Sequence, residues 1–164
     1  MSAGVHLVGI GSDLHRMEAG RKLVLGGVEI PFEKGPIGHS DGDVAIHALI
    51  DALLGAAGLP DIGERFPDSD PRYKGVDSTL LLLDVINDLG RRGLQPVNVD
   101  LVIQAERPKL SAFKNVIREK LAGLLNLPVE RVSVKAKTGE GVDAIGRGEA
   151  IGCLCVVGLI KAVE

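Results

Sequence analysis

Apolar and polar residues alternate, or recur at helical spacing, along most of the chain. Strict alternation predicts strands at 97–103 and 132–136, where apolar side chains occupy every second position. Short apolar segments predict two more strands, at 6–11 and 150–160, and the second is expected to be central and buried on both faces. Residues 23–30 are predicted to form a hairpin, because Gly26 and Gly27 separate two short apolar-rich segments.

Apolar residues at helical spacing predict three helices, at 43–57, 78–92 and 111–126. Ser78 is expected to cap the second helix, and Gly93 is expected to end it. The stretches 31–42, 61–77 and 138–148 are rich in polar residues, glycine or proline and are predicted to be loops. Together these elements predict an α/β (α+β) fold, with a mixed four-stranded sheet, helices on one face and a small hairpin.

Composition indicates a single globular domain over residues 1–164. Hydrophobic residues make up 45% of the chain and charged residues 25%, values that exclude a disordered, collagen-like or disulfide-rich protein. The net charge is −3 and Lys and Arg form no block, so a nucleic-acid partner is not expected. The longest apolar stretch, 150–160, is shorter than the ~20 residues of a membrane helix, so no membrane partner is expected either.

Two features indicate a cytoplasmic protein. Residues 1–6 lack the charged and apolar regions of a secretory signal, and they are not the start of an Arg-rich transit peptide. Cys153 and Cys155 are the only cysteines, and on an extended segment two residues apart their side chains point the same way and cannot easily pair. We therefore expect free thiols in the core.

Asp13 and His15 offer a carboxylate and an imidazole on one face, if their segment is extended just beyond the end of the strand at 6–11. A third ligand from His39 or His47 would complete a zinc-like site with an open coordination position. The alternative is structural, because a single histidine in a helix is more often a hydrogen-bonded core residue than a ligand. The spacing alone does not choose between them.

Two loops have the composition of anion sites. Residues 38–43 lead directly into the helix at 43–57, where backbone N–H groups could hold a phosphate, or where Ser40, Asp41 or Asp43 could simply cap the helix. In the loop 138–148, Thr138 could donate to a phosphoryl oxygen, Glu140 could bind a hard cation and Arg147 could bind an anion. The alternative for this second loop is a solvated segment with a surface ion pair.

The long block at 39–56, followed by 61–63 and 66–71, closely resembles the 2-C-methyl-D-erythritol 2,4-cyclodiphosphate synthase family of the non-mevalonate isoprenoid pathway. The similarity continues through 11–15, 105–110, 135–140 and 146–149. These segments stand in the family's order and cover essentially the whole chain.

This resemblance implies a phosphorus–oxygen lyase. It would convert 4-diphosphocytidyl-2-C-methyl-D-erythritol 2-phosphate to the 2,4-cyclodiphosphate with release of CMP, as a homotrimer with active sites between subunits. Asp13, His15 and His47 match the ligands of a divalent metal, usually zinc. Glu140 matches the residue that helps to place Mg²⁺ or Mn²⁺ among the phosphates, and His39 and Thr138 match positions credited with stabilising the transition state.

The resemblance also implies the substrate contacts. Residues 61–63 match contacts to ribose and methylerythritol, 66–70 match a loop over the methylerythritol end, and 105–110 match a cytosine pocket supplied by another subunit. Arg147 matches a basic residue near the phosphates or the trimer axis. The full implied set is Asp13, His15, His39, Ser40, Asp61, Ile62, Gly63, Phe66, Pro67, Asp68, Ser69, Asp70, Ala105, Glu106, Arg107, Pro108, Lys109, Leu110, Lys137, Thr138, Gly139, Glu140 and Arg147.

The chain departs from the commonest family pattern at three positions. Ser12 stands where many members carry an aromatic residue, and Gly141 and Ala144 replace bulkier residues. These changes bear on loop order and on the centre of the trimer rather than on the metal ligands. Two other functions remain open from the residues: a phosphohydrolase using the same three ligands, and a non-catalytic trimer that binds a cytidine nucleotide.

Overall fold

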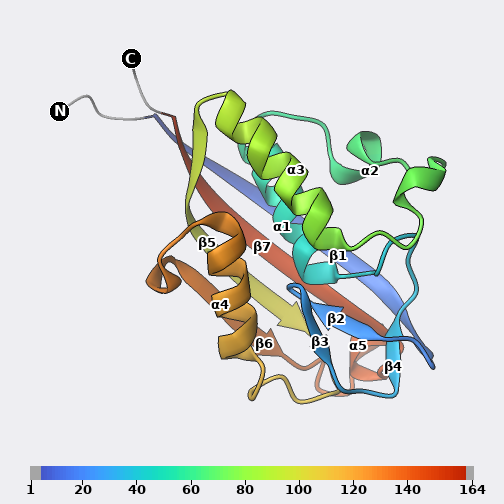
Figure 1. Ribbon diagram of the computed structural model, residues 1–164. Coiled ribbons are helices and arrows are strands. Elements are labelled where there is room, and N and C mark those ends of the chain that lie inside the picture. The colour runs from blue at the N-terminus through green and yellow to red at the C-terminus, as the bar shows by residue number, and fades with distance from the viewer. Residues whose placement is uncertain (1–4, 162–164) are drawn as a thin grey trace.

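A five-stranded sheet forms the centre of the protein in the computed structural model, which describes residues 5–161 (Figure 1). Its strand order is β4-β1-β7-β5-β6, and only β5 and β6 run parallel. The strands are β1 (Val5–Ala19), β4 (Lys34–Pro36), β5 (Leu94–Gln104), β6 (Val132–Lys137) and β7 (Ala150–Lys161). The expected mixed sheet is confirmed, but the expected count of four strands is wrong because β4 was predicted to be loop. The expectation that no secretory signal or transit peptide is present was based on residues 1–6, of which 1–4 lie outside the described part.

Strand β1 is much longer than the predicted segment 6–11. It pairs with β7 as far as Arg16 and then with β4 from Met17 onward. Asp13 and His15 therefore lie within a strand, and the expectation that they follow its end is wrong. The prediction failed because two polar side chains occupy positions on the helix-covered face, where alternation leads one to expect apolar residues.

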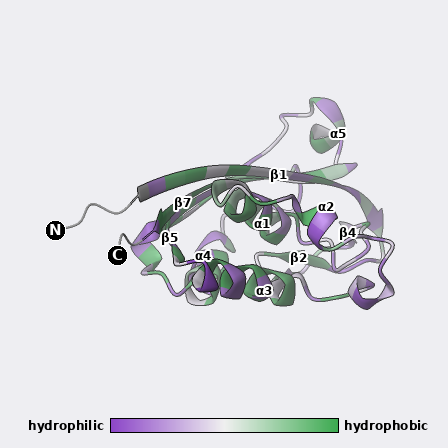
Figure 2. Cartoon of the chain, turned by 90° about the horizontal axis from the view of Figure 1, so that it is seen from above, coloured by the Kyte–Doolittle hydropathy of each residue, from purple (hydrophilic) through white to green (hydrophobic). Residues whose placement is uncertain are grey.

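Three long helices cover one face of this sheet, as Figure 2 shows. They are α1 (Val44–Ala56), α3 (Ser78–Arg91) and α4 (Lys114–Leu125), and they confirm the three predicted helices to within a few residues. Helix α1 packs between β1 and α3. Gly9 and Gly11 allow this close approach, because a Cβ atom at either position would collide with the backbone of α1 at Ala52 or Ala48. The part of α1 from Ala48 to Ala56 is thereby held against β1 at Gly9 and Gly11.

The predicted hairpin is confirmed as β2 (Leu23–Leu25) and β3 (Val28–Ile30). Both turn glycines have positive φ, +61° at Gly26 and +75° at Gly27, as a two-residue hairpin turn requires. Asp43, which is fully buried, joins this turn to α1. Its carboxylate accepts hydrogen bonds from the backbone N–H groups of Gly26, Gly27, Ala45 and Ile46. Asp43 is therefore both the N-cap of α1 and the anchor of the hairpin.

Short helical turns interrupt the segments predicted to be loops. They are α2 (Ile62–Arg65), η1 (Pro71–Tyr73), η2 (Val129–Arg131) and α5 (Asp143–Gly146). At the start of α3, Asp77 accepts a hydrogen bond from the backbone N–H of Thr79 and is the cap. The expectation that Ser78 caps this helix is wrong, because its side chain is turned into the protein.

The opposite face of the sheet carries exposed apolar side chains. Strand β7 is central, as predicted, but the expectation that it is buried on both faces is wrong: Leu154 is 40% exposed and Val156 38%. On β1 the neighbouring side chains Val8, Ile10 and Leu14 are more exposed still. We call these five residues the bare face. Helix α5 projects on this side of the sheet (Figure 2).

The inward positions of β7 include Cys153 and Cys155, which are buried and unpaired as predicted. Burial raises the pKa of both thiols, that of Cys155 to about 12, so neither is a reactive thiolate at neutral pH. Over residues 5–161 there is no helix with both the length and the apolar character needed to cross a bilayer.

Candidate functional site

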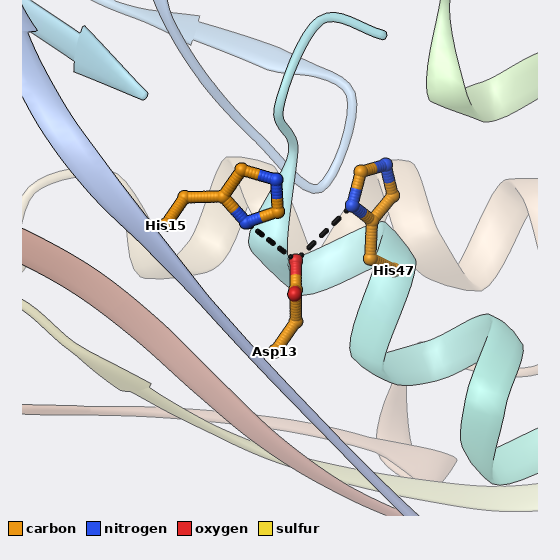
Figure 3. A group of neighbouring side chains, drawn as sticks. All are labelled: Asp13, His15 and His47. Carbon is orange, nitrogen blue, oxygen red and sulfur yellow. Dashed lines mark hydrogen bonds and ion pairs between the residues drawn. The ribbon is translucent and has the colours of Figure 1, made fainter. Parts of the chain in front are cut away.

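Asp13, His15 and His47 form one cluster at the contact between β1 and α1 (Figure 3). Asp13 and His15 are two residues apart on β1 and so point to the same face, while His47 lies in the first turn of α1. Asp13 Oδ2 is 2.9 Å from Nδ1 of His15 and 3.1 Å from Nδ1 of His47. One ligand atom from each residue lies within 4.8 Å of the others. Of the two candidates for a third ligand, the structure therefore places His47 in this cluster, and His39 is not part of it.

The electrostatics of the cluster suit a cation. Burial would raise the pKa of Asp13, but the close polar contacts and charge of His15 and His47 outweigh it and lower the pKa to about 2. For His47, burial would lower the pKa, but the hydrogen bond and charge of Asp13 outweigh it and raise the pKa above 6.5. In the metal-free protein the ionised carboxylate of Asp13 therefore favours the protonated form of His47, and His47 in turn favours the ionised form of Asp13.

The donor set also fits a divalent metal. One carboxylate and two imidazoles are ligands that zinc takes when it keeps one position open for a substrate. His15 supplies a further observation, because its Nδ1 is buried and its 2.9 Å contact with Asp13 Oδ2 lacks the geometry of a hydrogen bond. A buried polar atom left without a partner is costly, and coordination to a cation would satisfy it.

A cavity of about 420 Å³ opens beside the cluster. Besides the three clustered side chains it is lined by His39, Ser40, Ile62, Gly63, Phe66 and Asp68. The segments predicted to contact substrate at 39–40, 62–63 and 66–68 are thus brought together with the candidate metal ligands. His39 Nε2 is buried and has no hydrogen-bond partner among the described residues, so it is available to a bound molecule.

Several predicted contacts near this cavity have structural roles instead of lining it. Asp61 caps α2 by accepting from the N–H of Glu64, and Asp70 pairs with Arg72. Pro67 and Ser69 belong to the same loop as the lining residues Phe66 and Asp68. The position of the loop is fixed partly by Phe66, which is buried and packs edge-on against Tyr73 with their ring centroids 5.3 Å apart.

The remaining predicted residues form a second group that does not line the cavity beside Asp13, His15 and His47. Parallel strands β5 and β6 end side by side, so 105–110 lies next to 137–140, and Gly139 donates its N–H to the carboxylate of Glu106. Thr138 donates to Glu140, and both side chains are exposed. Glu106, Arg107 and Arg147 line a separate cavity of about 190 Å³. Ala105 and Leu110 are buried in the core, and Pro108 and Lys109 lie in the bend between them.

Sequence reasoning missed two residues behind His47. Ser78 Oγ lies 2.9 Å from His47 Nε2, and Asp41 accepts a hydrogen bond from the Ser78 hydroxyl. Asp41 and Ser78 were considered only as helix caps. No local pattern could reveal their role, because 31 residues separate His47 from Ser78 and 37 separate Ser78 from Asp41.

Comparison with known proteins places these features in a family context. A model of the YgbB family matches residues 6–160. The 2-C-methyl-D-erythritol 2,4-cyclodiphosphate synthase of Desulfosudis oleivorans is 52% identical over 154 residues, covering 94% of this chain and 92% of that protein. A solved 2C-methyl-D-erythritol-2,4-cyclodiphosphate synthase in a CDP-bound form has a TM-score of 0.86 at 41% identity, covering 93% of this chain and 99% of that one. The bifunctional IspDF of Campylobacter jejuni has a TM-score of 0.93 at 39% identity; the match covers 98% of this chain, which spans 43% of that longer protein.

Proposed function

The chain belongs to the YgbB family, and we propose that its domain, residues 1–164, forms 2-C-methyl-D-erythritol 2,4-cyclodiphosphate in the non-mevalonate pathway. The substrate is 4-diphosphocytidyl-2-C-methyl-D-erythritol 2-phosphate and the second product is CMP. The names of the curated relatives and the CDP in a solved neighbour support this assignment. The observation that carries it is the cluster of Asp13, His15 and His47 at the wall of a cavity of about 420 Å³.

The reaction is an intramolecular phosphoryl transfer. An oxygen of the 2-phosphate attacks the β-phosphorus of the diphosphate, a new P–O bond forms, and the bond to the CMP oxygen breaks. Because the attacking group is already an oxyanion, the protein needs no strong general base. The difficulty lies in bringing two anions together and stabilising the charge that develops during transfer.

The side chains of the site have separate roles in this proposal. Asp13, His15 and His47 would hold zinc and Glu140 would help to hold Mg²⁺ or Mn²⁺, and the two cations would supply Lewis-acid neutralisation of phosphate charge. His39 and Thr138 would donate to the transferring group, together with the backbone of Ser40. Folding the substrate into a ring-closing pose within the cavity could supply part of the ~7–11 kcal/mol available from ideal proximity.

Assembly of several copies of the chain would explain how the residues that lie away from the cavity at Asp13 could still contact substrate. Residues 105–110 and 137–140, with Arg147, do not line the metal cavity of their own chain, so we propose that they complete the cavity of a neighbouring copy. The bare face provides a surface for such contacts, because apolar side chains exposed together mark an interface. We propose a homotrimer, the assembly that the family resemblance implies, in the cytoplasm and without a nucleic-acid or membrane partner.

Phosphorus NMR of the products tests the proposed reaction. Incubation of the purified protein with the CDP-linked substrate, Zn²⁺ and Mg²⁺ is expected to give a cyclic diphosphate and CMP in equal amounts. A linear phosphate product would instead identify a phosphohydrolase. Binding of CDP without any turnover would identify a non-catalytic nucleotide-binding protein.

A further inference from the structure

We propose that Asp41 and Ser78 are positioning residues that hold His47 in the tautomer whose Nδ1 is free to bind a metal ion. The inference rests on the proposed metal site, but it concerns groups that do not touch the metal. Ser78 contacts Nε2 of His47, whereas Asp13 contacts Nδ1, and Asp41 contacts Ser78.

The contacts form a chain from a carboxylate to the imidazole. Ser78 is fully buried at the first residue of α3, and its Oγ lies 2.9 Å from Nε2 of His47. The same hydroxyl donates to Asp41 Oδ1 at 2.5 Å, and the Ser78 backbone N–H donates to Asp41 Oδ2 at 3.0 Å. Asp41 Oδ1 also accepts from the backbone N–H of Asp43 at 3.1 Å.

Counting donors and acceptors shows which group donates in each of these hydrogen bonds. A carboxylate without a proton only accepts, and a serine hydroxyl has one hydrogen to donate. Because that hydrogen is committed to Asp41, Ser78 can only accept from His47 and favours a hydrogen on Nε2. On the other side of the ring, the carboxylate of Asp13 lies 3.1 Å from Nδ1 and favours a hydrogen there, so in the metal-free protein the two sides compete for the one N–H of a neutral ring. A cation bound by Asp13 would remove this competition, and the Ser78 contact would then keep the hydrogen on Nε2 and leave the lone pair of Nδ1 for the cation. Partners of this kind fix the orientation and tautomer of metal-binding histidines.

Ser40 cannot set the tautomer by itself. Its Oγ lies 3.1 Å from His47 Nε2 and 3.4 Å from Ser78 Oγ, and it accepts from the Gly42 N–H. Its own hydrogen has no acceptor comparable to Asp41, so it can donate to Nε2 or accept from it. The carboxylate of Asp41 is therefore the group that favours a hydrogen on Nε2, because it fixes the direction in which the Ser78 hydroxyl donates.

The backbone holds this arrangement in place. Gly75 donates its N–H to the carbonyl of His39, and Asp41 donates its N–H to the carbonyl of Val76. These two hydrogen bonds align the segment before α1 with the segment before α3. The chain from Asp41 to His47 thus joins the two helix starts behind the metal cluster.

The test is the ring nitrogen signals of His47 in ¹⁵N-labelled, metal-free protein under alkaline conditions, where the ring is neutral. The wild-type ring is expected to hold a larger share of the Nε2–H form than the Asp41→Asn ring, because the Ser78–Asp41 contact opposes the preference of Asp13 for a hydrogen on Nδ1. In Asp41→Asn the amide can donate to Ser78 Oγ, which frees the Ser78 hydrogen for Nε2, so the ring should shift toward Nδ1–H. Zinc affinity, measured by competition with a chromophoric chelator, should fall about 10- to 100-fold.

Ser78→Ala is the second variant, and it removes the hydroxyl without adding bulk. It should weaken the preference for Nε2–H and lower zinc affinity by less than Asp41→Asn, because the Ser40 hydroxyl remains as a partner. Asp77→Asn is the matched control, since Asp77 caps the same helix one residue away and contacts Thr79 rather than His47. It should leave both the tautomer and the zinc affinity unchanged.

A zinc-binding wild type whose ring holds no more of the Nε2–H form than that of Asp41→Asn overturns this inference and leaves the proposed function standing. Zinc affinities of Asp41→Asn and Ser78→Ala within twofold of Asp77→Asn also overturn it. A wild type that binds no zinc at all would instead refute the metal site itself, and the inference with it.

Discussion

At the scale of single residues, the charges of Asp13 and His47 make the stability of the metal-free protein depend on pH. The pKa of Asp13 is lowered from 3.8 to about 2, so its contribution is complete above 3.8 and lost as the pH falls toward 2. The pKa of His47 is raised from 6.5, so its contribution is complete below 6.5 and lost as the pH rises through the raised value. The ion pair therefore stabilises the metal-free protein most between pH 3.8 and 6.5.

Urea unfolding in the presence of EDTA measures this contribution. The difference in unfolding free energy between wild type and Asp13→Asn is expected to be largest between pH 3.8 and 6.5 and to shrink at higher pH. A difference that stays constant or grows above pH 6.5 would contradict the assigned pKa shifts.

Glu140 is proposed to hold the second cation and not the zinc, so changing it should affect catalysis without affecting zinc binding. Glu140→Gln removes the charge proposed to hold the second cation, and the side chain does not line the cavity at Asp13. We expect turnover to fall about 10- to 100-fold, the loss of one charge-assisted contact, with zinc content unchanged. Steady-state kinetics paired with metal analysis checks this, and a parallel loss of zinc would argue against separate roles.

The sequence predicted the cluster of Asp13, His15 and His47 only in part. The two-residue spacing of Asp13 and His15 predicted a shared face, but the choice of His47 over His39 came from the family resemblance and not from spacing. The positions of Asp41 and Ser78 could not be predicted, because a buried serine at a helix start has the same local sequence as a capping serine. Side-chain networks between distant segments depend on how the helices pack.

At the scale of elements, Asp43 joins α1 to the hairpin. Asp43→Ala would leave the N–H groups of Gly26, Gly27, Ala45 and Ile46 without their acceptor in a buried place. We expect a loss of about 2–4 kcal/mol in the free energy of unfolding, a lost cap together with unsatisfied buried donors.

Chemical denaturation of Asp43→Ala beside Asp77→Ala tests this expectation. Asp77 is an exposed cap of α3, so its loss should cost only about 1 kcal/mol. Equal losses in the two variants would show that Asp43 acts as an ordinary cap and does not anchor the hairpin.

The helices and the hairpin were predictable because local rules and the final fold agree there. The stripe of apolar residues in 43–57 and the two glycines at 26–27 each favour one structure. The second half of β1 was not predictable, because the residues that make the site, Asp13 and His15, break the alternation of the strand. Strand β4 contains Gly35 and Pro36, which are typical of loops, and proline is tolerated there because β4 is an edge strand.

At the scale of the whole molecule, two features support the proposed assembly: the bare face, and the distance of residues 105–110 and 137–140 from the cavity of their own chain. Alternation along β7 places Leu154 and Val156 on the face opposite the three long helices, so the structure shows an exposed surface where the sequence predicted burial. The number of copies follows only from the family resemblance, because nothing in the periodicity of one chain encodes it.

Replacing an apolar side chain of the bare face by a charge tests this assembly. Leu154→Lys is expected to reduce the mass measured by light scattering from three chains to one and to abolish turnover, while zinc binding persists. Leu80→Lys is the matched control, since Leu80 is an exposed leucine on α3, and it should remain trimeric and active. A wild type of one-chain mass with full turnover would refute the need for neighbouring copies.

The measurement that tests the central claim most directly is anomalous X-ray scattering at the zinc edge from crystals of the zinc-loaded protein. The account predicts one strong peak per chain between Asp13 Oδ2, Nδ1 of His15 and Nδ1 of His47, and its loss in crystals of Asp13→Asn. A stoichiometric peak at any other place, or an undiminished peak in Asp13→Asn, would contradict it.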